Sequence, residues 1–271
     1  MNELMLVLGL LVLTAAFFHF AHPLMRRVGL LTGAVTVFAA GYLLSGNLWV
    51  GAGCVGAVLL LPWIEILLRI RKLRLPLRKP LRQATPPSQE MFPDLGDVTD
   101  SIEASGFEHA ADLGWEMDGY RQFLRLFACP EKREEAAITY VEQSQIGFHF
   151  ASVTSRAADG SVYITWNCPV PSSLKCLPTV HLNRLPGEAP FGTLLAGHQA
   201  FLAQHGLEQA KLQPVETESV RVSVERDMES QMQHNLREGL LERQGEEHGR
   251  YSWRGMLFLW WQVLREFFRM A

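Results

Sequence analysis

Hydrophobic and polar positions divide this chain into an apolar N-terminal part and a longer part in which the two kinds of residue alternate. Residues 4–21, 28–45 and 48–68 form apolar stretches with very few charged side chains. At about 1.5 Å per residue, helices of this length approach or cross the ~30 Å hydrocarbon core of a bilayer. The pattern therefore predicts three transmembrane helices. A cleaved secretory signal is the alternative for the first stretch. Such signals need a positively charged start, but the only charged side chain before the apolar run is that of Glu3.

Basic residues lie at the ends that fix the orientation of these helices. Arg26 and Arg27 lie between the first two stretches, and seven Lys or Arg follow the third, from Arg69 to Arg82. Short loops rich in Lys and Arg stay in the cytoplasm. We therefore expect the N-terminus outside, the bulk of the chain in the cytoplasm and the protein in the inner (cytoplasmic) membrane. The basic segment should contact anionic headgroups of the lipid bilayer, through Arg69, Arg71, Lys72, Arg74, Arg78 and Lys79.

Small residues in the apolar stretches indicate close helix packing. Gly29 and Gly33 form a G-x-x-x-G pair, with Gly41 further along the same stretch and Gly53 in the next one. Residues without a bulky side chain let two helix backbones approach each other. The three helices should therefore pack within one chain, and a homo-oligomer formed through the same face is the alternative.

Strand-length segments rich in β-branched and aromatic residues fill the middle of the chain. Turn residues separate them, and the Asp159-Gly160 step is a strong hairpin signal. Strands joined by short turns pair with their neighbours, so the pattern predicts an antiparallel meander of about four strands. The predicted strands are Tyr120–Ala128, Glu135–Glu142, Ile146–Thr154 and Ser161–Asn167.

Helical spacing on both sides of the strands predicts helices at residues 94–105, 193–205 and 216–243. Five prolines from Pro76 to Pro93 forbid a continuous helix there, which predicts a semi-rigid linker. The predicted fold class is a membrane-anchored α+β protein. Its parts are a transmembrane anchor at 1–68, a basic, proline-rich juxtamembrane linker at 69–93, a cytoplasmic α+β domain at 94–250 and an amphipathic helix at 251–271.

The C-terminal helix has one broad apolar face and one polar face. Trp260, Trp261, Phe267 and Phe268 belong to the apolar face, whereas Arg265 belongs to the polar face. This pattern is typical of a helix that lies in the membrane interface. We expect these four aromatic residues to contact the membrane surface. A helix packed against the domain's own sheet shows the same pattern and is the alternative.

The net charge of −3 conceals an uneven distribution. Up to Arg82 the chain carries nine Lys or Arg against two Glu, which gives +7, and the remainder carries sixteen against twenty-six Asp or Glu, which gives −10. An acidic domain repels phosphates, so we expect no nucleic-acid partner. The four cysteines should be reduced thiols, because the soluble part is predicted to be cytoplasmic.

The sequence offers little recognisable chemistry. Cys168 and Cys176, with His181 downstream, do not have a zinc-ligand spacing. His198 and His205 share a predicted helix face but have no third donor, so we expect them to be satisfied or exposed histidines. Neither an esterase elbow nor a nucleotide-binding loop occurs. We therefore predict no catalytic residue, no metal and no cofactor.

Seven short segments after the predicted linker occur in a distinctive order. They are Gly106-Phe107, Phe127–Glu131, Phe150–Ser152, Ala158–Gly160, Thr165–Pro169, Leu194–His198 and Gly249–Gly255. In this order they resemble an uncharacterised group of bacterial membrane-anchored proteins. That resemblance implies a recurring domain between Asp94 and Gly255, and no functional residue can be carried over from it.

Two functions remain compatible with these observations. The first is an integral membrane protein that displays a cytoplasmic α+β domain for a membrane or cytoplasmic protein partner or for a ligand, without catalysis. The alternative is a membrane-associated hydrolase or lipid-handling enzyme. Its apolar pocket would be lined by aromatic residues of two predicted strands, namely Phe148, Phe150, Tyr163 and Trp166.

Overall fold

The computed structural model describes residues 2–19, 23–70, 74–78, 80–117, 119–143, 146–185, 187 and 189–270. The chain forms two compact units. The helical unit comprises Met1–Arg74, Gly239–Glu242 and Arg250–Ala271, and the sheet unit comprises Leu75–Glu238 and Arg243–Gly249. The helices and the seven-stranded antiparallel-rich sheet described below confirm the predicted α+β fold class.

The helical unit contains α1 (Asn2–His19), α2 (Pro23–Ser45), α3 (Leu48–Arg69) and α7 (Trp253–Met270). Among the described residues, α2 alone is long and apolar enough to cross a membrane, over Val28–Ser45. The apolar parts of α1 and α3 are shorter, at Met5–Phe17 and Leu48–Leu61. By length and composition, one candidate span is therefore shown, and the three-span anchor stays a prediction.

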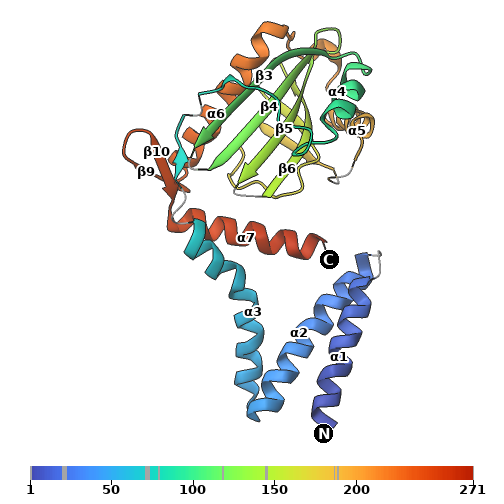
Figure 1. Ribbon diagram of the computed structural model, residues 1–271, viewed down its shortest axis with the longest axis vertical. Helices are drawn as coiled ribbons and strands as arrows, with labels where there is room; N and C mark the ends of the chain where they lie inside the picture. Colours follow the sequence, from blue (N-terminus) through green and yellow to red (C-terminus); the bar gives the residue numbers. More distant parts are fainter. Residues whose placement is uncertain are drawn as a thin grey trace. The chain divides into compact units, whose positions relative to one another are not determined.

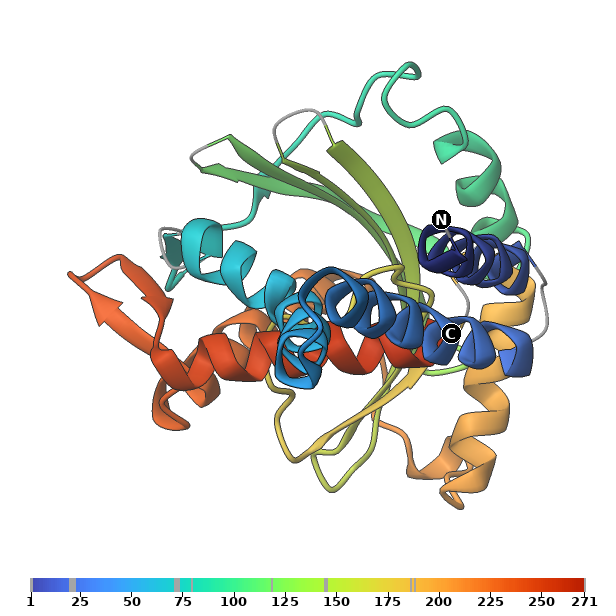
Figure 2. The same ribbon diagram turned by 90° about the horizontal axis from the view of Figure 1, so that it is seen from below.

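Helices α1, α2 and α3 pack through small and hydroxyl side chains. Figure 2 shows α1 and α2 lying side by side, and the buried Thr36 hydroxyl of α2 lies 3.3 Å from that of Thr14 in α1. A Cβ placed on Gly41 would lie 3.0 Å from the Cα of Gly51 in α3. The tight turn between α2 and α3 ends at Asn47, whose side chain accepts a hydrogen bond from the Trp49 amide at 2.9 Å.

The sheet unit is built on a seven-stranded sheet with the order β2-β3-β4-β5-β6-β7-β8 (Figure 1). Its strands are β2 (Arg82–Gln83), β3 (Glu108–Met117), β4 (Tyr120–Cys129), β5 (Glu134–Gln143), β6 (Ile146–Arg156), β7 (Val162–Trp166) and β8 (Val180–Arg184). All neighbours pair antiparallel except β7 and β8, which are parallel.

The predicted meander matches β4 to β7 closely, but the prediction of about four strands is wrong. Strand β3 has no β-branched residue and has a register shift between His109 and Ala111, so its alternation is weak in the sequence. Strand β8 follows a proline-rich connection and pairs parallel to β7, which adjacent hairpin signals do not reveal.

The two faces of the sheet are covered by different helices. On one face, Phe123, Phe127 and Ile138 pack against α4 (Leu95–Glu103) and α5 (Phe191–Gln204). On the opposite face, Leu124 and Leu126 pack against α6 (Val220–Arg237). Successive strand residues point to opposite faces, so β4 supplies both cores from adjacent positions.

Helix α6 ends six residues before the predicted boundary at Arg243. Gly239 follows it with φ of 70°, a left-handed conformation that favours glycine and stops the helix. The chain then forms the hairpin β9 (Leu241–Gln244) and β10 (His248–Tyr251). Short 3-10 turns at Gln209–Lys211 and Thr217–Ser219 precede α6.

Part of the segment predicted to be a linker belongs to the sheet unit. Strand β1 (Leu75–Pro76) pairs with β10, and β2 pairs with β3. The side chains of Leu77, Leu81 and Phe92 are buried. Because apolar residues at intervals tie this segment to the domain, prolines here shape its path across the domain surface.

Candidate functional site

A groove of about 1120 Å³ lies beside α6 in the sheet unit. Four parts of the sheet unit form its walls: residues 76–78 with 80–82, the end of β3, one side of α6 and the β9–β10 hairpin. The residues that line it include Leu77, Arg78, Leu81, Arg82, Trp115, Glu116, Met117, Arg221, Glu225, Met228, Glu229, Met232, Arg243, Glu246, Glu247 and His248.

The apolar part of the groove combines a fixed aromatic ring with adaptable side chains. The Trp115 indole donates a hydrogen bond to Gln122 at 2.7 Å and stacks on Tyr120 at 4.9 Å between ring centroids, so its position is set. Met117, Met228 and Met232 also line the groove. Unbranched, polarisable methionine side chains adjust to different apolar surfaces, so the groove suits a ligand of variable shape.

The rim carries charges of both signs. Arg221 donates to Glu225 at 3.1 Å and to the Leu81 carbonyl at 2.8 Å, which ties α6 to the segment opposite. Arg78 and Glu229 form an exposed ion pair of 3.8 Å. Among the described residues, other rim side chains make no hydrogen bond or ion pair and are open to a partner; these are Arg82, Arg243, Glu116, Glu246 and Glu247.

An ion triad, in which Glu135 is buried and Arg156 is partly buried, holds α6 against the sheet. Arg156 of β6 donates to Glu135 of β5 at 3.1 and 3.2 Å and to Asp227 of α6 at 2.7 and 3.2 Å. Burial raises the pKa of Glu135, and the Arg156 charge opposes that effect. Since one partner lies on α6 and two lie on strands, the triad fixes the helix that forms one wall of the groove.

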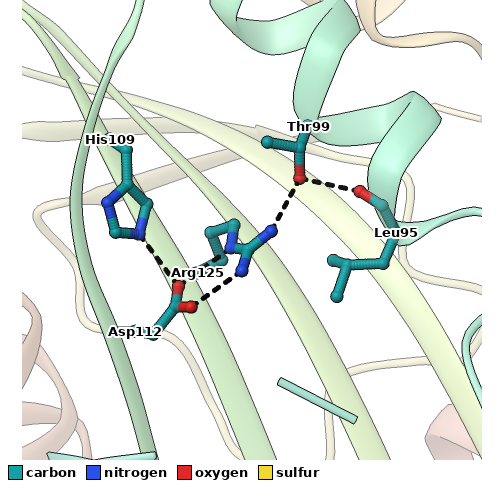
Figure 3. A network of polar contacts seen from close by, with 5 residues as sticks. All are labelled: Leu95, Thr99, His109, Asp112 and Arg125. Atoms are coloured by element: carbon teal, nitrogen blue, oxygen red, sulfur yellow. Dashed lines mark hydrogen bonds and ion pairs between the residues drawn. The ribbon is translucent and has the colours of Figure 1, made fainter. Parts of the chain in front are cut away.

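A second polar network fixes β3, the strand that ends in the groove (Figure 3). Arg125 of β4 forms a two-point contact with Asp112 of β3 at 2.8 and 2.9 Å and also donates to Thr99 of α4 at 3.1 Å. His109 approaches the same carboxylate at 3.0 Å. Burial alone would raise the pKa of Asp112, but hydrogen bonds from Arg125 and His109 outweigh it and hold that pKa below its usual value.

A serine and a histidine meet in the core, as they do in many hydrolases, but neither is accessible. The His198 ring lies 3.0 Å from the Ser155 hydroxyl and 3.0 Å from the Thr165 hydroxyl. His198 and Thr165 are 0% exposed, and Ser155 is 1% exposed. Burial lowers the pKa of His198 to about 4, so its ring stays neutral. This chain of hydrogen bonds joins α5 to β6 and β7 and satisfies a buried histidine.

Glu134 is the second unusual buried group. It pairs with Cys129 at the start of β5 and is 4% exposed, and its Oε2 atom has no hydrogen-bond partner among the described residues. Burial raises the pKa of Glu134 to about 7, and the nearby charge of Lys132 opposes this effect. Glu134 does not line the groove, and its buried carboxyl makes the stability of the fold depend on pH.

The predicted histidines and cysteines do not assemble into a metal site. Within the described ranges, no three His, Cys, Asp or Glu side chains are grouped for a metal ion. His205 is exposed and bonds to the Phe201 carbonyl at 2.9 Å. Cys168 is buried and Cys176 is partly buried, and both are free thiols.

The aromatic residues proposed to line a lipid pocket are divided between two faces of the sheet. Phe150 and Trp166 contact each other edge to face at 5.7 Å. Tyr163 is buried with Leu202 and stacks on His181 at 4.6 Å. Side chains along a strand alternate between the two faces of the sheet. Tyr163 and Trp166 are three positions apart on β7, so they lie on opposite faces and cannot line one cavity. The proposed common lining is therefore wrong.

The structure describes only some of the residues predicted to contact the membrane. Arg74 and Arg78 are exposed. Trp261 is 61% exposed, whereas the Trp260 ring packs on Trp63 at 5.9 Å. The remaining predicted contacts lie outside the described residues or side chains; these are Arg69, Arg71, Lys72, Lys79, Phe267 and Phe268.

The predicted packing glycines differ in their surroundings. Gly29 is buried, and a Cβ on Gly33 would lie 3.4 Å from the Thr14 methyl group of α1. Gly41 lies at the close approach of α2 to α3. A Cβ on Gly53 would meet no heavy atom of the described chain within 4 Å.

Sequence reasoning missed the groove because its walls are distant in the chain. Met228 and Met232 lie in the helix predicted at 216–243, but Trp115 lies on β3, which was not predicted. Leu77 and Leu81 lie in the predicted linker, where apolar residues between basic ones were the available signal.

No known family model, curated protein or solved structure matches this chain.

Proposed function

We propose that this chain is an integral membrane protein that displays a cytoplasmic α+β domain, and that the groove beside α6 binds an amphipathic segment of a partner protein. The observation that carries the proposal is the groove itself, with its Trp and Met lining and its open charges of both signs. The candidate span in α2 and the basic segment after α3 support the anchor and its orientation.

The lining of the groove favours a peptide segment over a small metabolite. Its volume of about 1120 Å³ is near the upper end of the range of about 300–1,000 Å³ for ligand pockets, so it has room for such a segment. Apolar side chains on one face of a helix fit such a groove, as in other helix-in-groove complexes. The open rim charges Arg82, Arg243 and Glu247 suit a segment whose apolar residues are flanked by both acidic and basic residues.

Binding is better supported than hydrolysis. A nucleophile and its base must be able to reach a substrate, and the Ser155–His198 pair is sealed inside the core. Among the described residues that line the groove, the charged groups form ion pairs or remain open on the rim, and no nucleophile is held by a base.

Site-specific photo-crosslinking in living cells tests the proposal. A photoreactive phenylalanine analogue replaces Met228 in the groove, and the matched control carries it at exposed Gln199 on α5, which covers the opposite face of the sheet. We expect a discrete protein adduct at position 228 that is absent at position 199. Reversing the rim charges with Glu246→Lys and Glu247→Lys should lower its yield several-fold.

Equal adducts at both positions would refute a specific groove partner. Adducts with lipid alone at position 228 would refute the peptide assignment and support the lipid-handling alternative.

A further inference from the structure

Helix α7 has two apolar stripes with different surroundings. Gly255, Met256 and Leu259 are buried. On the other side, Trp253, Leu257 and Trp261 are 54%, 52% and 61% exposed; we call these three residues the outer stripe. Soluble surfaces rarely present large apolar residues together, so a contiguous stripe of this kind indicates a binding surface.

Contacts within the helical unit set the rotation of α7 about its axis. The Trp63 ring of α3 contacts Trp253 at 6.5 Å and Trp260 at 5.9 Å. A Cβ on Gly255 would collide with the Leu240 carbonyl oxygen, so the helix approaches that backbone closely. Trp253 therefore lies at the edge where the outer stripe meets α3, and these contacts give Leu257 and Trp261 a defined direction within the unit.

Two arginines lie beside the outer stripe. At about 100° per residue, the stripe covers an arc of about 80°, and Arg254 and Arg265 lie within about 40° of its edge at Trp261. Both arginines are exposed and make no ion pair with the described residues. Their charge next to exposed indoles complements an apolar layer bordered by phosphate groups.

We infer that the outer stripe binds the surface of a bilayer that contains anionic phospholipids, with Arg254 and Arg265 at the headgroup phosphates. Helix α7 belongs to the same compact unit as α2, the candidate span, so a membrane occupant agrees with the anchor proposed above. The inference rests on the proposed membrane anchor. It also separates Trp261, which faces lipid, from Trp260, which holds the helix on α3.

Photo-crosslinking of the full chain in lipid nanodiscs tests this inference. The photoreactive residue replaces Leu257 or Trp261, and the matched control replaces Gln262, about 140° from the centre of the stripe. Discs contain either phosphatidylcholine alone or phosphatidylcholine with phosphatidylglycerol at a ratio of 3:1. We expect phospholipid adducts at 257 and 261 that exceed those at 262 at least five-fold in the anionic discs.

The charge requirement has its own variant. The double substitution Arg254→Gln and Arg265→Gln should lower the adduct yield several-fold in anionic discs and leave it unchanged in neutral discs. Equal yields at 257, 261 and 262, or protein adducts in place of lipid adducts, would overturn the inference. An effect of the double substitution that is equal in both discs would overturn the assignment to anionic lipid.

Extraction of cell membranes with alkaline carbonate tests the anchor separately. Release of the full chain would contradict the proposed anchor, whereas a retained chain without lipid adducts would contradict the α7 inference alone.

Discussion

Replacing Glu134 by Gln should stabilise the folded protein at alkaline pH and leave its stability unchanged at acidic pH. The side chain is 4% exposed, one carboxyl oxygen has no partner among the described residues, and burial raises its pKa from 4.5 to about 7. Gln has nearly the same shape but cannot ionise. The substitution therefore removes the cost of a buried negative charge without creating a cavity.

The size of the effect follows from the difference in pKa between the folded and unfolded states. At 1.36 kcal/mol per pH unit, a difference of about 2.5 units corresponds to roughly 3 kcal/mol. Below pH 4.5 the carboxyl is protonated in both states and contributes no difference. Between pH 4.5 and 7 the unfolded state loses its proton first, so this group lowers the free energy of unfolding as pH rises. Above pH 7 the carboxyl is ionised in both states, and the free energy of unfolding is lowered by the full amount of roughly 3 kcal/mol.

Urea denaturation of the full chain in detergent, followed by circular dichroism from pH 4.5 to 8, measures this effect. We expect the Glu134→Gln variant to match the unmodified protein at pH 4.5 and to exceed it by about 3 kcal/mol at pH 8. The control is Glu131→Gln, at an exposed position before the same strand, which should change little at either pH. A gain of equal size at both pH values would show that packing, rather than ionisation, causes it, and would refute the reasoning.

Three further predictions concern stability. Burial lowers the pKa of His198 to about 4, so this group should lower the free energy of unfolding by about 3 kcal/mol as the pH falls from 6.5 to 4. In urea denaturation, His198→Gln should reduce the dependence of that free energy on pH in this range, and an unchanged dependence would contradict the prediction. Gly255→Ala should cost about 1–3 kcal/mol in thermal unfolding, because the Leu240 carbonyl must move, whereas Gly192→Ala, where a Cβ meets nothing within 4 Å, should not destabilise the protein. Arg125→Lys keeps the charge but loses the two-point contact with Asp112, and should cost about 1–2 kcal/mol in urea denaturation; equal stability would show that charge alone suffices there.

The sequence predicted most of the central fold because that part is local. Strands β4 to β7 follow one another through short turns, so each strand pairs with its neighbour in the chain. The same reasoning failed for β8, which pairs parallel to β7 after a longer connection. It also failed for β3, whose register shift breaks the alternation.

The candidate site was less predictable than the fold. Trp115, Leu81 and Met228 lie far apart in the chain and meet only when β3, the proline-rich segment and α6 pack together. The expectation that His198 is a satisfied histidine was confirmed by its contacts with Ser155 and Thr165. Its partners lie on other strands and could not be identified from spacing.

The sequence by itself determined the apolar helices, the central antiparallel strands and the amphipathic C-terminal helix, because periodicity and charge act over a few neighbouring residues. The tertiary structure alone decided which groups lose contact with water. It buried Glu134 with one carboxyl oxygen unpaired among the described residues, and it sealed Ser155 with His198. It also left Trp261 exposed while its neighbour Trp260 packed on Trp63. Burial depends on segments that are distant in the chain, and the pKa of an acid or the accessibility of a ring depends on burial.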